Sequence, residues 1–280
     1  MPPRSLARID VGLVIQRKAS VSVKASVRQG SIIAGRLQSF TGGDSGRRGL
    51  TSGLGSPAGA SAWRFVAGQR PVAAPTDVPS AERIAIFNPG DNEAQIAITV
   101  LLESDATAAT SGTPPGAVPT PLTLTVPANS SAIADVASIA PAGQFNVSVT
   151  ADELIVAERV LDYTLKGVVF TTVQLGSRLA AETWYFPIGV PTGATGRIDV
   201  LNSTGVPTTF SVKTVGAAGP VAVAGFESVK LPAGAVVSVP ITGLSVGQSL
   251  VVEGAGALIV ERMVNSPAGW SATLGLPMIG

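Results

Sequence analysis

Two Glu-Arg pairs are the polar residues whose spacing most clearly suggests a shared role. Glu158-Arg159 follows Leu-Ile-Val-Ala, and Glu261-Arg262 follows Leu-Ile-Val, so both pairs lie near the end of an expected strand. Consecutive side chains of a strand point to opposite faces, so one member of each pair must lie on an apolar face, where a charge needs a partner. We favour a structural ion pair, or an arginine stem that covers a sheet edge. The alternative is that Arg159 and Arg262 bind a ligand.

The side chains that most enzymes use are missing. The chain contains no His and no Cys, which excludes imidazole and thiolate catalysis, the Ser-His-Asp triad and the usual zinc ligands. Two carboxylates can hydrolyse a glycosidic bond, and the closest acidic groups are Asp91/Glu93 and Asp152/Glu153. Both groups lie in expected turns, and a calcium ion at 91–93 would have no counterpart later in the chain. We therefore expect no enzymatic activity, no catalytic or metal-binding residue and no cofactor.

Trp63 and Trp184 are the aromatic candidates for binding. Each opens a similar stretch, Trp-Arg-Phe in the first case and Trp-Tyr-Phe in the second. A tryptophan can stack on a sugar ring, but one that opens a domain is more often an apolar plug at the domain junction, the interpretation we favour.

The elements around these tryptophans occur twice. Arg83 to Gly90 and Arg197 to Gly205 are alternating strands that end in Asn followed by Pro-Gly or Ser-Thr-Gly, where we expect Asn to tolerate a positive φ. Each copy closes on a strand that ends in Leu-Gly, at 175–176 and at 274–275.

This repeat predicts the domain organisation. We expect one module at residues 59–178, a second at 179–280 and the end of an earlier copy at 1–58. Within that end, Val21–Val27 alternates as a strand does. Since a domain without its first strands would leave sheet edges uncovered, we expect Met1 not to be the native start. The first module differs from the second mainly in an insertion at Glu103–Pro121.

The composition agrees with an all-β fold. Hydrophobic residues make up 45% but aromatic residues only 5%, and 32 Gly and 21 Pro supply frequent turns. Short alternating strands with a turn every few residues predict tandem antiparallel β-sandwiches of the immunoglobulin or fibronectin-like kind.

The charge and the hydropathy of the chain argue against a nucleic-acid-binding protein and against a membrane-spanning one. A net charge of +1 argues against a nucleic-acid partner, and no stretch has the ~18–20 apolar residues of a membrane span. The apolar run Val11–Ile15 is too short for the core of an export signal.

Four short motifs resemble those of a known family. They are Leu-Gly-Ser-x-x-Gly-Ala-x-x-Trp-x-Phe at 54–65, Phe-Asn-Pro-Gly-Asp at 87–91, Val-Pro-Ala at 126–128 and Val-Ala-Glu-Arg at 156–159. In this order they resemble an actinobacterial family of secreted or envelope-associated proteins of unknown function. The resemblance implies tandem β-sandwich repeats behind an N-terminal anchor or export signal, encoded beside envelope glycosyltransferases. Because the motifs are turns and strand ends, no functional residue can be transferred.

We expect a non-enzymatic structural or interaction protein that is exported or held at the cell envelope. Its expected partner is a cell-wall glycan or another envelope protein. The alternative is a carbohydrate-binding module for cell-wall or capsular glycans, with Trp63, Trp184, Arg159 and Arg262 as the candidate binding residues. An exposed tryptophan would favour that alternative, and a buried one would remove it.

Overall fold

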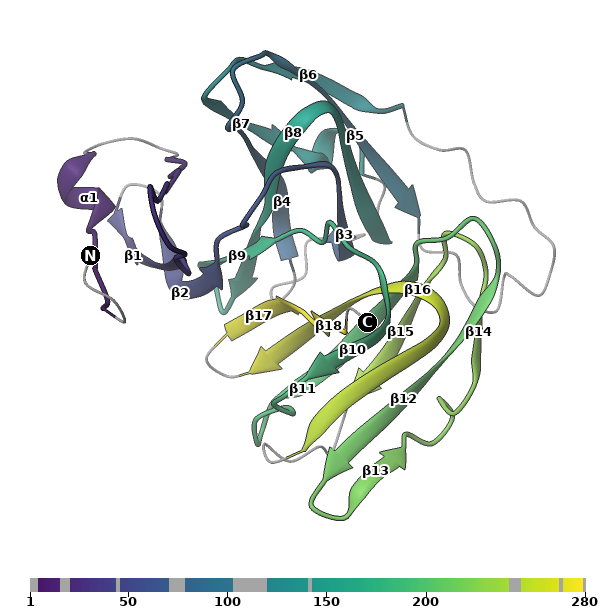
Figure 1. Cartoon of the computed structure of the whole chain (residues 1–280). Helices are drawn as coiled ribbons and strands as arrows, with labels where there is room; N and C mark the ends of the chain where they lie inside the picture. The colour runs from purple at the N-terminus through teal and green to yellow at the C-terminus, as the bar shows by residue number, and fades with distance from the viewer. Residues whose placement is uncertain are drawn as a thin grey trace.

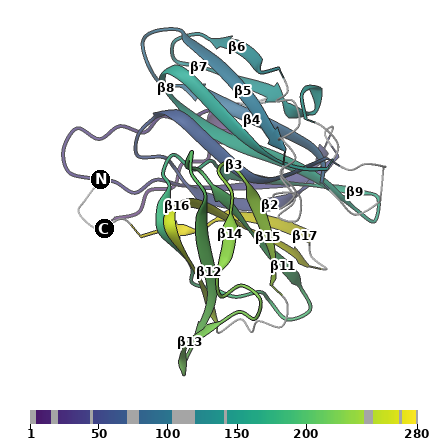
Figure 2. The same ribbon diagram turned by 90° about the vertical axis from the view of Figure 1, so that its right-hand side faces the viewer.

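The computed structural model describes residues 5–15, 21–43, 46–70, 79–102, 120–140, 143–241, 248–266 and 269–278. Within these ranges the protein is all-β, apart from one turn of helix and a short 3-10 segment. Two curled, mainly antiparallel sheets lie one above the other in Figure 1, with the N-terminal elements at the side, and Figure 2 shows them from a perpendicular direction.

The first sheet holds nine strands in the described part of the chain. The N-terminal elements are α1 (Val11–Val14), β1 (Gly35–Gly42) and β2 (Arg47–Leu54). They are followed by β3 (Ala60–Arg70), β4 (Pro79–Asn88), β5 (Ala94–Leu102), β6 (Leu122–Val126), β7 (Ser130–Asp135), η3 (Val136–Ser138), β8 (Gly143–Leu165) and β9 (Val168–Leu175).

The long strand β8 organises this sheet. Its first part pairs with β3 and β5, and its second part pairs with β4 and β9, so the sheet curls around one core. Val, Ile and Phe side chains fill that core because they alternate with polar residues along each strand. The largest apolar side chains there with an exposure below 2% are Trp63, Phe65, Ile84, Ile86, Ile98 and Ile155.

The second sheet is built on the same plan around β16. Its strands are β10 (Ala181–Phe186), β11 (Thr195–Asn202), β12 (Thr208–Gly216), β13 (Gly219–Ala222), β14 (Val229–Leu231), β15 (Val236–Ile241), β16 (Ser249–Ser266), β17 (Gly269–Leu274) and β18 (Leu276–Pro277). The first part of β16 pairs with β10 and β12, and the second part pairs with β11 and β17.

Corresponding residues of the two sheets make corresponding hydrogen bonds. Trp63 and Trp184 each donate the indole N–H to two backbone carbonyls, one three residues earlier and one on the long central strand. The acceptors are Ala60 and Ile155 for the first tryptophan, and Ala181 and Leu258 for the second, at 2.9 to 3.2 Å. The all-β class is confirmed, whereas the immunoglobulin-like tandem sandwich and the module boundaries stay predictions.

Two buried asparagines hold the turns after β4 and β11. Asn88 and Asn202 are both 0% exposed, and each side-chain amide donates to three backbone carbonyls. Neither residue has a positive φ, so the conformational role expected from the sequence is wrong. The side chain, rather than the backbone, is what these turns require.

The segment before β1 differs from the expectation. Val21–Val27 has no strand neighbour among the described residues, and Val21, Val23 and Val27 are exposed. Alternation alone does not make a strand, because the backbone groups need a partner chain. The hairpin of β1 and β2 does form, and β2 lies parallel to β9. The insertion expected at Glu103–Pro121 lies, apart from its last two residues, outside the described ranges.

The close packing of Gly176 yields a test of the first core. A Cβ at Gly176 would lie 2.6 Å from Cζ of Phe65, whereas a Cβ at Gly205 would meet nothing within 4 Å. We expect Gly176→Ala to lower the free energy of unfolding by about 1–3 kcal/mol, because the ring is buried and has little room to shift. Urea denaturation, with Gly205→Ala as the control, measures this. Equal stability of the two variants would contradict the packing described.

Candidate functional site

The two Glu-Arg pairs occupy opposite orientations in the two sheets. On β8 the arginine is buried, with Arg159 1% exposed, and Glu158 is half-buried. On β16 the glutamate is buried, with Glu261 0% exposed, and Arg262 is half-buried. The sequence correctly required one charge of each pair to be internal. The structure shows that the two internal charges are partners of each other.

Arg159 and Glu261 enclose the peptide groups of Val66. Arg159 Nη2 donates to Glu261 Oε2 at 2.8 Å, and Nη1 donates to the Val66 carbonyl at 2.6 Å. The Val66 N–H donates to Glu261 Oε1 at 3.0 Å, which closes the ring. Gln174 Oε1 accepts a further bond from Arg159 Nη2 at 2.8 Å.

A bulge in β3 makes this ring possible. The register of β3 against β8 shifts between Phe65 and Gly68, which takes the N–H and C=O of Val66 out of the ladder. The Val66 side chain, from the first sheet, packs within the hydrophobic core of the second. The two sheets are therefore joined by both an apolar side chain and a buried ion pair.

Further charges surround the ion pair. Glu82, 4% exposed, places Oε1 4.0 Å from Arg159 Nη1. Asp199, fully buried on β11, accepts from Arg197 Nε at 2.9 Å and from the Ser238 hydroxyl. Acidic groups thus outnumber the basic ones around the buried guanidinium.

We call the contact between the two sheets at Val66, Arg159 and Glu261 the junction. Burial and the neighbouring charges determine which of its groups are protonated. Burial raises the pKa of Glu261 to about 7, against the opposing effects of Arg159 and the Val66 N–H. Burial would lower the pKa of Arg159, but the carboxylates of Glu261 and Glu82 hold it above its ordinary value. Arg159 therefore stays charged, and Glu261 is the group that titrates near neutrality.

Apolar contacts continue the junction between β9 and β17. Leu161, Met263 and Ala272 form a small buried cluster with Trp270 packed against it. Tyr163 stacks on Phe170 with ring centroids 5.5 Å apart, and it also contacts Trp270 at 6.2 Å.

Three of the four candidate binding residues from the sequence are buried, and the fourth is half-buried. Trp63 and Trp184 are 0% exposed, so neither offers a ring face to a sugar. Arg159 is buried in the junction. Arg262 is half-buried, lies over the Phe186 ring at 5.3 Å and donates to the carbonyls of Ile188 and Gly189.

Of the acidic groups considered for catalysis, Asp91 and Glu93 lie in the turn between β4 and β5, as expected. Asp152 and Glu153 lie within β8, so the turn expected there is wrong. Asp152 accepts from the Gln95 N–H at 2.8 Å, and Glu153 accepts from Asn92 at 3.1 Å. Glu93 accepts from the Gln95 side chain at 3.0 Å. No group of three metal-ligating side chains occurs in the described ranges.

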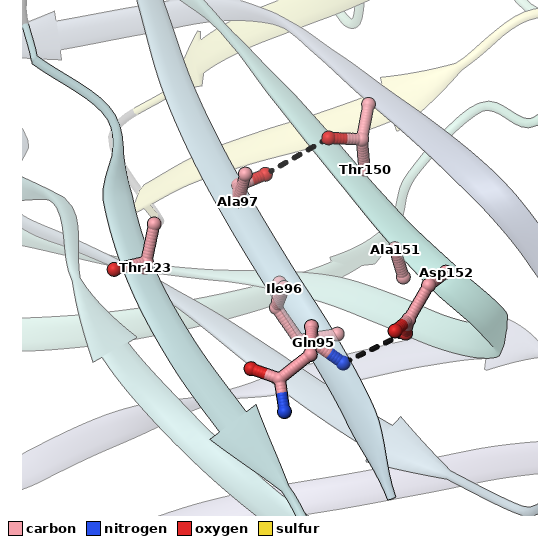
Figure 3. Close-up of a pocket in the computed structure, with 7 residues that line it drawn as sticks. All are labelled: Gln95, Ile96, Ala97, Thr123, Thr150, Ala151 and Asp152. Atoms are coloured by element: carbon pink, nitrogen blue, oxygen red, sulfur yellow. Dashed lines mark hydrogen bonds between the residues drawn. The ribbon is translucent and has the colours of Figure 1, made fainter.

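A shallow depression lies on the outer face of β5, β6 and β8 (Figure 3). Its volume is about 280 Å³, and it is lined by Gln95, Ile96, Ala97, Thr123, Thr150, Ala151 and Asp152. The Thr150 hydroxyl donates to the Ala97 carbonyl at 3.5 Å, and Asp152 already holds the Gln95 N–H. None of these lining residues has an aromatic or cationic side chain that could bind a ligand.

The chain is an all-β protein whose two curled sheets meet at a buried ion pair. It belongs to DUF5719, a family of unknown function whose model matches residues 67–261, more than half of the chain. The narrower resemblance to actinobacterial secreted proteins stays a prediction. No curated protein matches the chain. None of the described helices is long and apolar enough to cross a membrane.

Three solved structures show limited likeness. The Anabaena sensory rhodopsin transducer is 23% identical over 36% of this chain and 95% of its own, with a TM-score of 0.29. Thermotoga maritima protein 1070 is 18% identical over 42% and 94%, with a TM-score of 0.33. The Pseudomonas aeruginosa CupB2 chaperone is 10% identical over 73% and 94%, with a TM-score of 0.18. Scores this low do not establish a common fold.

Titration of Glu261 makes stability depend on pH. The folded pKa of about 7 lies above the ordinary value of 4.5, so this carboxyl stabilises the fold below pH 4.5 and loses that effect as the pH rises through 7. Over this window we expect the free energy of unfolding of the wild type to fall by up to about 3 kcal/mol relative to Glu261→Gln.

Urea denaturation at a series of pH values measures the difference. The variant retains Arg159, Glu82 and Asp199, so subtracting its profile isolates Glu261. Glu253→Gln, which removes a carboxyl that is 43% exposed, serves as the control substitution. A Glu261→Gln profile that runs parallel to that of the wild type would disprove the assigned titration.

Proposed function

We propose that this protein is a non-enzymatic structural and interaction protein, exported or held at the cell envelope, and built of β-sandwich modules at 59–178 and 179–280 joined at a fixed angle. The observation that carries the proposal is the buried ring of Arg159, Glu261 and Val66. An active site normally leaves its charged groups open to substrate, whereas these charges are closed off and bonded to one another.

The junction is suited to a fixed angle rather than to a hinge. A buried ion pair tolerates little displacement, because each charge that loses its partner keeps the cost of leaving water. Insertion of Val66 into the second core adds an apolar contact at the same place. Rotation of one sheet against the other would have to break both interactions together.

The corresponding hydrogen bonds support the module interpretation. Equivalent tryptophans and equivalent buried asparagines bond to equivalent carbonyls in the two sheets. The carbohydrate-binding alternative has no such support, because both tryptophans proposed as platforms are buried.

Spin labels can test the fixed angle. Because the chain has no Cys, Thr123→Cys and Lys230→Cys introduce single exposed label sites on β6 and β14. We expect one narrow distance distribution by pulsed electron paramagnetic resonance. Arg159→Met should broaden it, because Glu261 and the Val66 carbonyl lose their donor. Lys213→Met, which removes an exposed ion pair, should leave it narrow. A broad distribution in the unmodified background would refute the fixed junction.

Cell fractionation can test the location. An antibody against the native protein should detect it in the medium or in the envelope fraction of cells that produce it. A cytoplasmic enzyme should serve as the marker for lysis. Recovery of the protein together with that marker would overturn the proposed location without affecting the fixed junction.

A further inference from the structure

Three arginines occupy the same place in three hairpins. Arg36, Arg159 and Arg262 each lie one residue after the position that pairs with the leucine of a Leu-Gly sequence. In each hairpin the glycine N–H then donates to a carbonyl of the first strand or, in the hairpin of β1 and β2, of the residue before it. These bonds join Gly55 to Ala34, Gly176 to Ala157 and Gly275 to Val260, at 2.9 to 3.1 Å.

The first two arginines form ion pairs with glutamates at corresponding positions. Arg36 Nη1 contacts Glu158 Oε2 at 2.6 Å, and Arg159 Nη2 contacts Glu261 Oε2 at 2.8 Å. Each arginine thus binds the glutamate that directly precedes the next arginine in the series. The ion pairs connect successive hairpins rather than residues within one hairpin.

Arg262 has the same setting but no carboxylate. Its guanidinium lies over Phe186 as that of Arg159 lies over Phe65, at 5.3 and 6.0 Å. Its Nη1 donates to backbone carbonyls, as that of Arg159 does. Among the described residues no acidic side chain forms an ion pair with it, and burial lowers its pKa.

The surface beside Arg262 is apolar and open. Ile188, whose carbonyl accepts from Arg262, is 57% exposed, whereas Val66, whose carbonyl accepts from Arg159, is fully buried in the adjoining core. Beside Arg262 the second sheet thus leaves an apolar side chain exposed, at the position where the first sheet buries one.

Glu158 is the matching carboxylate that a second copy of the chain can supply. Its pair with Arg36 is partly open, with side chains 24% and 39% exposed, against 0% and 1% for Glu261 and Arg159. The hairpin that carries Arg36 has one buried residue among those described, Thr51, and it is bonded to β8 and β9 through Arg47–Asp162 at 3.1 Å and Thr51–Val173 at 3.0 Å. Replacing it by the hairpin of β16 and β17 would exchange one hairpin for another of the same kind.

We propose that the Arg262 end of this chain docks onto the first sheet of a second copy, where Arg262 takes the place of Arg36 on Glu158 and Ile188 becomes buried. The contact joins different surfaces of the two copies and leaves an open end on each. Repetition of such a contact gives an open filament, or a ring where the rotation between copies closes. The inference relies on the module alignment proposed above, but it concerns contacts between molecules.

Sedimentation velocity of the full chain over a range of concentrations tests the docking. We expect reversible growth beyond the monomer, strengthened by Arg36→Ala, which frees Glu158. Arg262→Glu should weaken association about thirtyfold or more, as expected when one partner of a desolvated ion pair is lost. Lys230→Glu makes the same change of charge at an exposed site and should have no such effect.

A double variant in which the two charges are exchanged completes the test. Glu158→Arg combined with Arg262→Glu should restore the association that Arg262→Glu alone removes. Arg36→Ala protein that stays monomeric at every concentration would overturn the proposal, as would association that Arg262→Glu does not weaken. Thermal unfolding of each variant identifies one that has not folded. Because the label distances report on one molecule, a failure here is distinguishable from failure of the fixed junction.

Discussion

The backbone N–H and C=O of Val66 depend for their hydrogen bonds on charged side chains that are far away in the sequence. A bulge removes these backbone groups from the β ladder, and a buried backbone group without a partner is costly. Arg159 and Glu261 satisfy both groups while neutralising each other. Each charge is costly to bury without the other, so bulge, ion pair and sheet junction form one unit.

The rest of the architecture follows from two long strands. β8 and β16 each belong to two parts of a curled sheet, which brings the Glu-Arg sequence to the place where the sheets meet. Local pattern predicted most of the strands but not the place where the sheets meet. Trp63 and Trp184 are each the fourth residue of a strand and pack in the core of their own sheet. Strands depend on neighbours in the sequence, which is why the alternation of residues reveals them.

What the sequence could not show is which distant groups meet. The two Glu-Arg pairs are alike in sequence, yet one buries its arginine and the other its glutamate, because Arg159 binds across the junction. Glu82 and Val66 carried no signal of their own, since their role depends on a bulge and on packing between sheets. Val21–Val27 shows the converse, a good strand pattern without a strand beside it.

The distance along the chain between Arg159 and Glu261 has a consequence for synthesis. The two residues are 102 positions apart, and a ribosome adds about 5–20 residues per second. For about 5–20 seconds after Arg159 has been added, Glu261 has therefore not yet been synthesised and cannot pair with it. During that interval Glu82 is the acidic group already at hand. The nascent chain thus carries its own temporary counter-ion until the permanent one arrives.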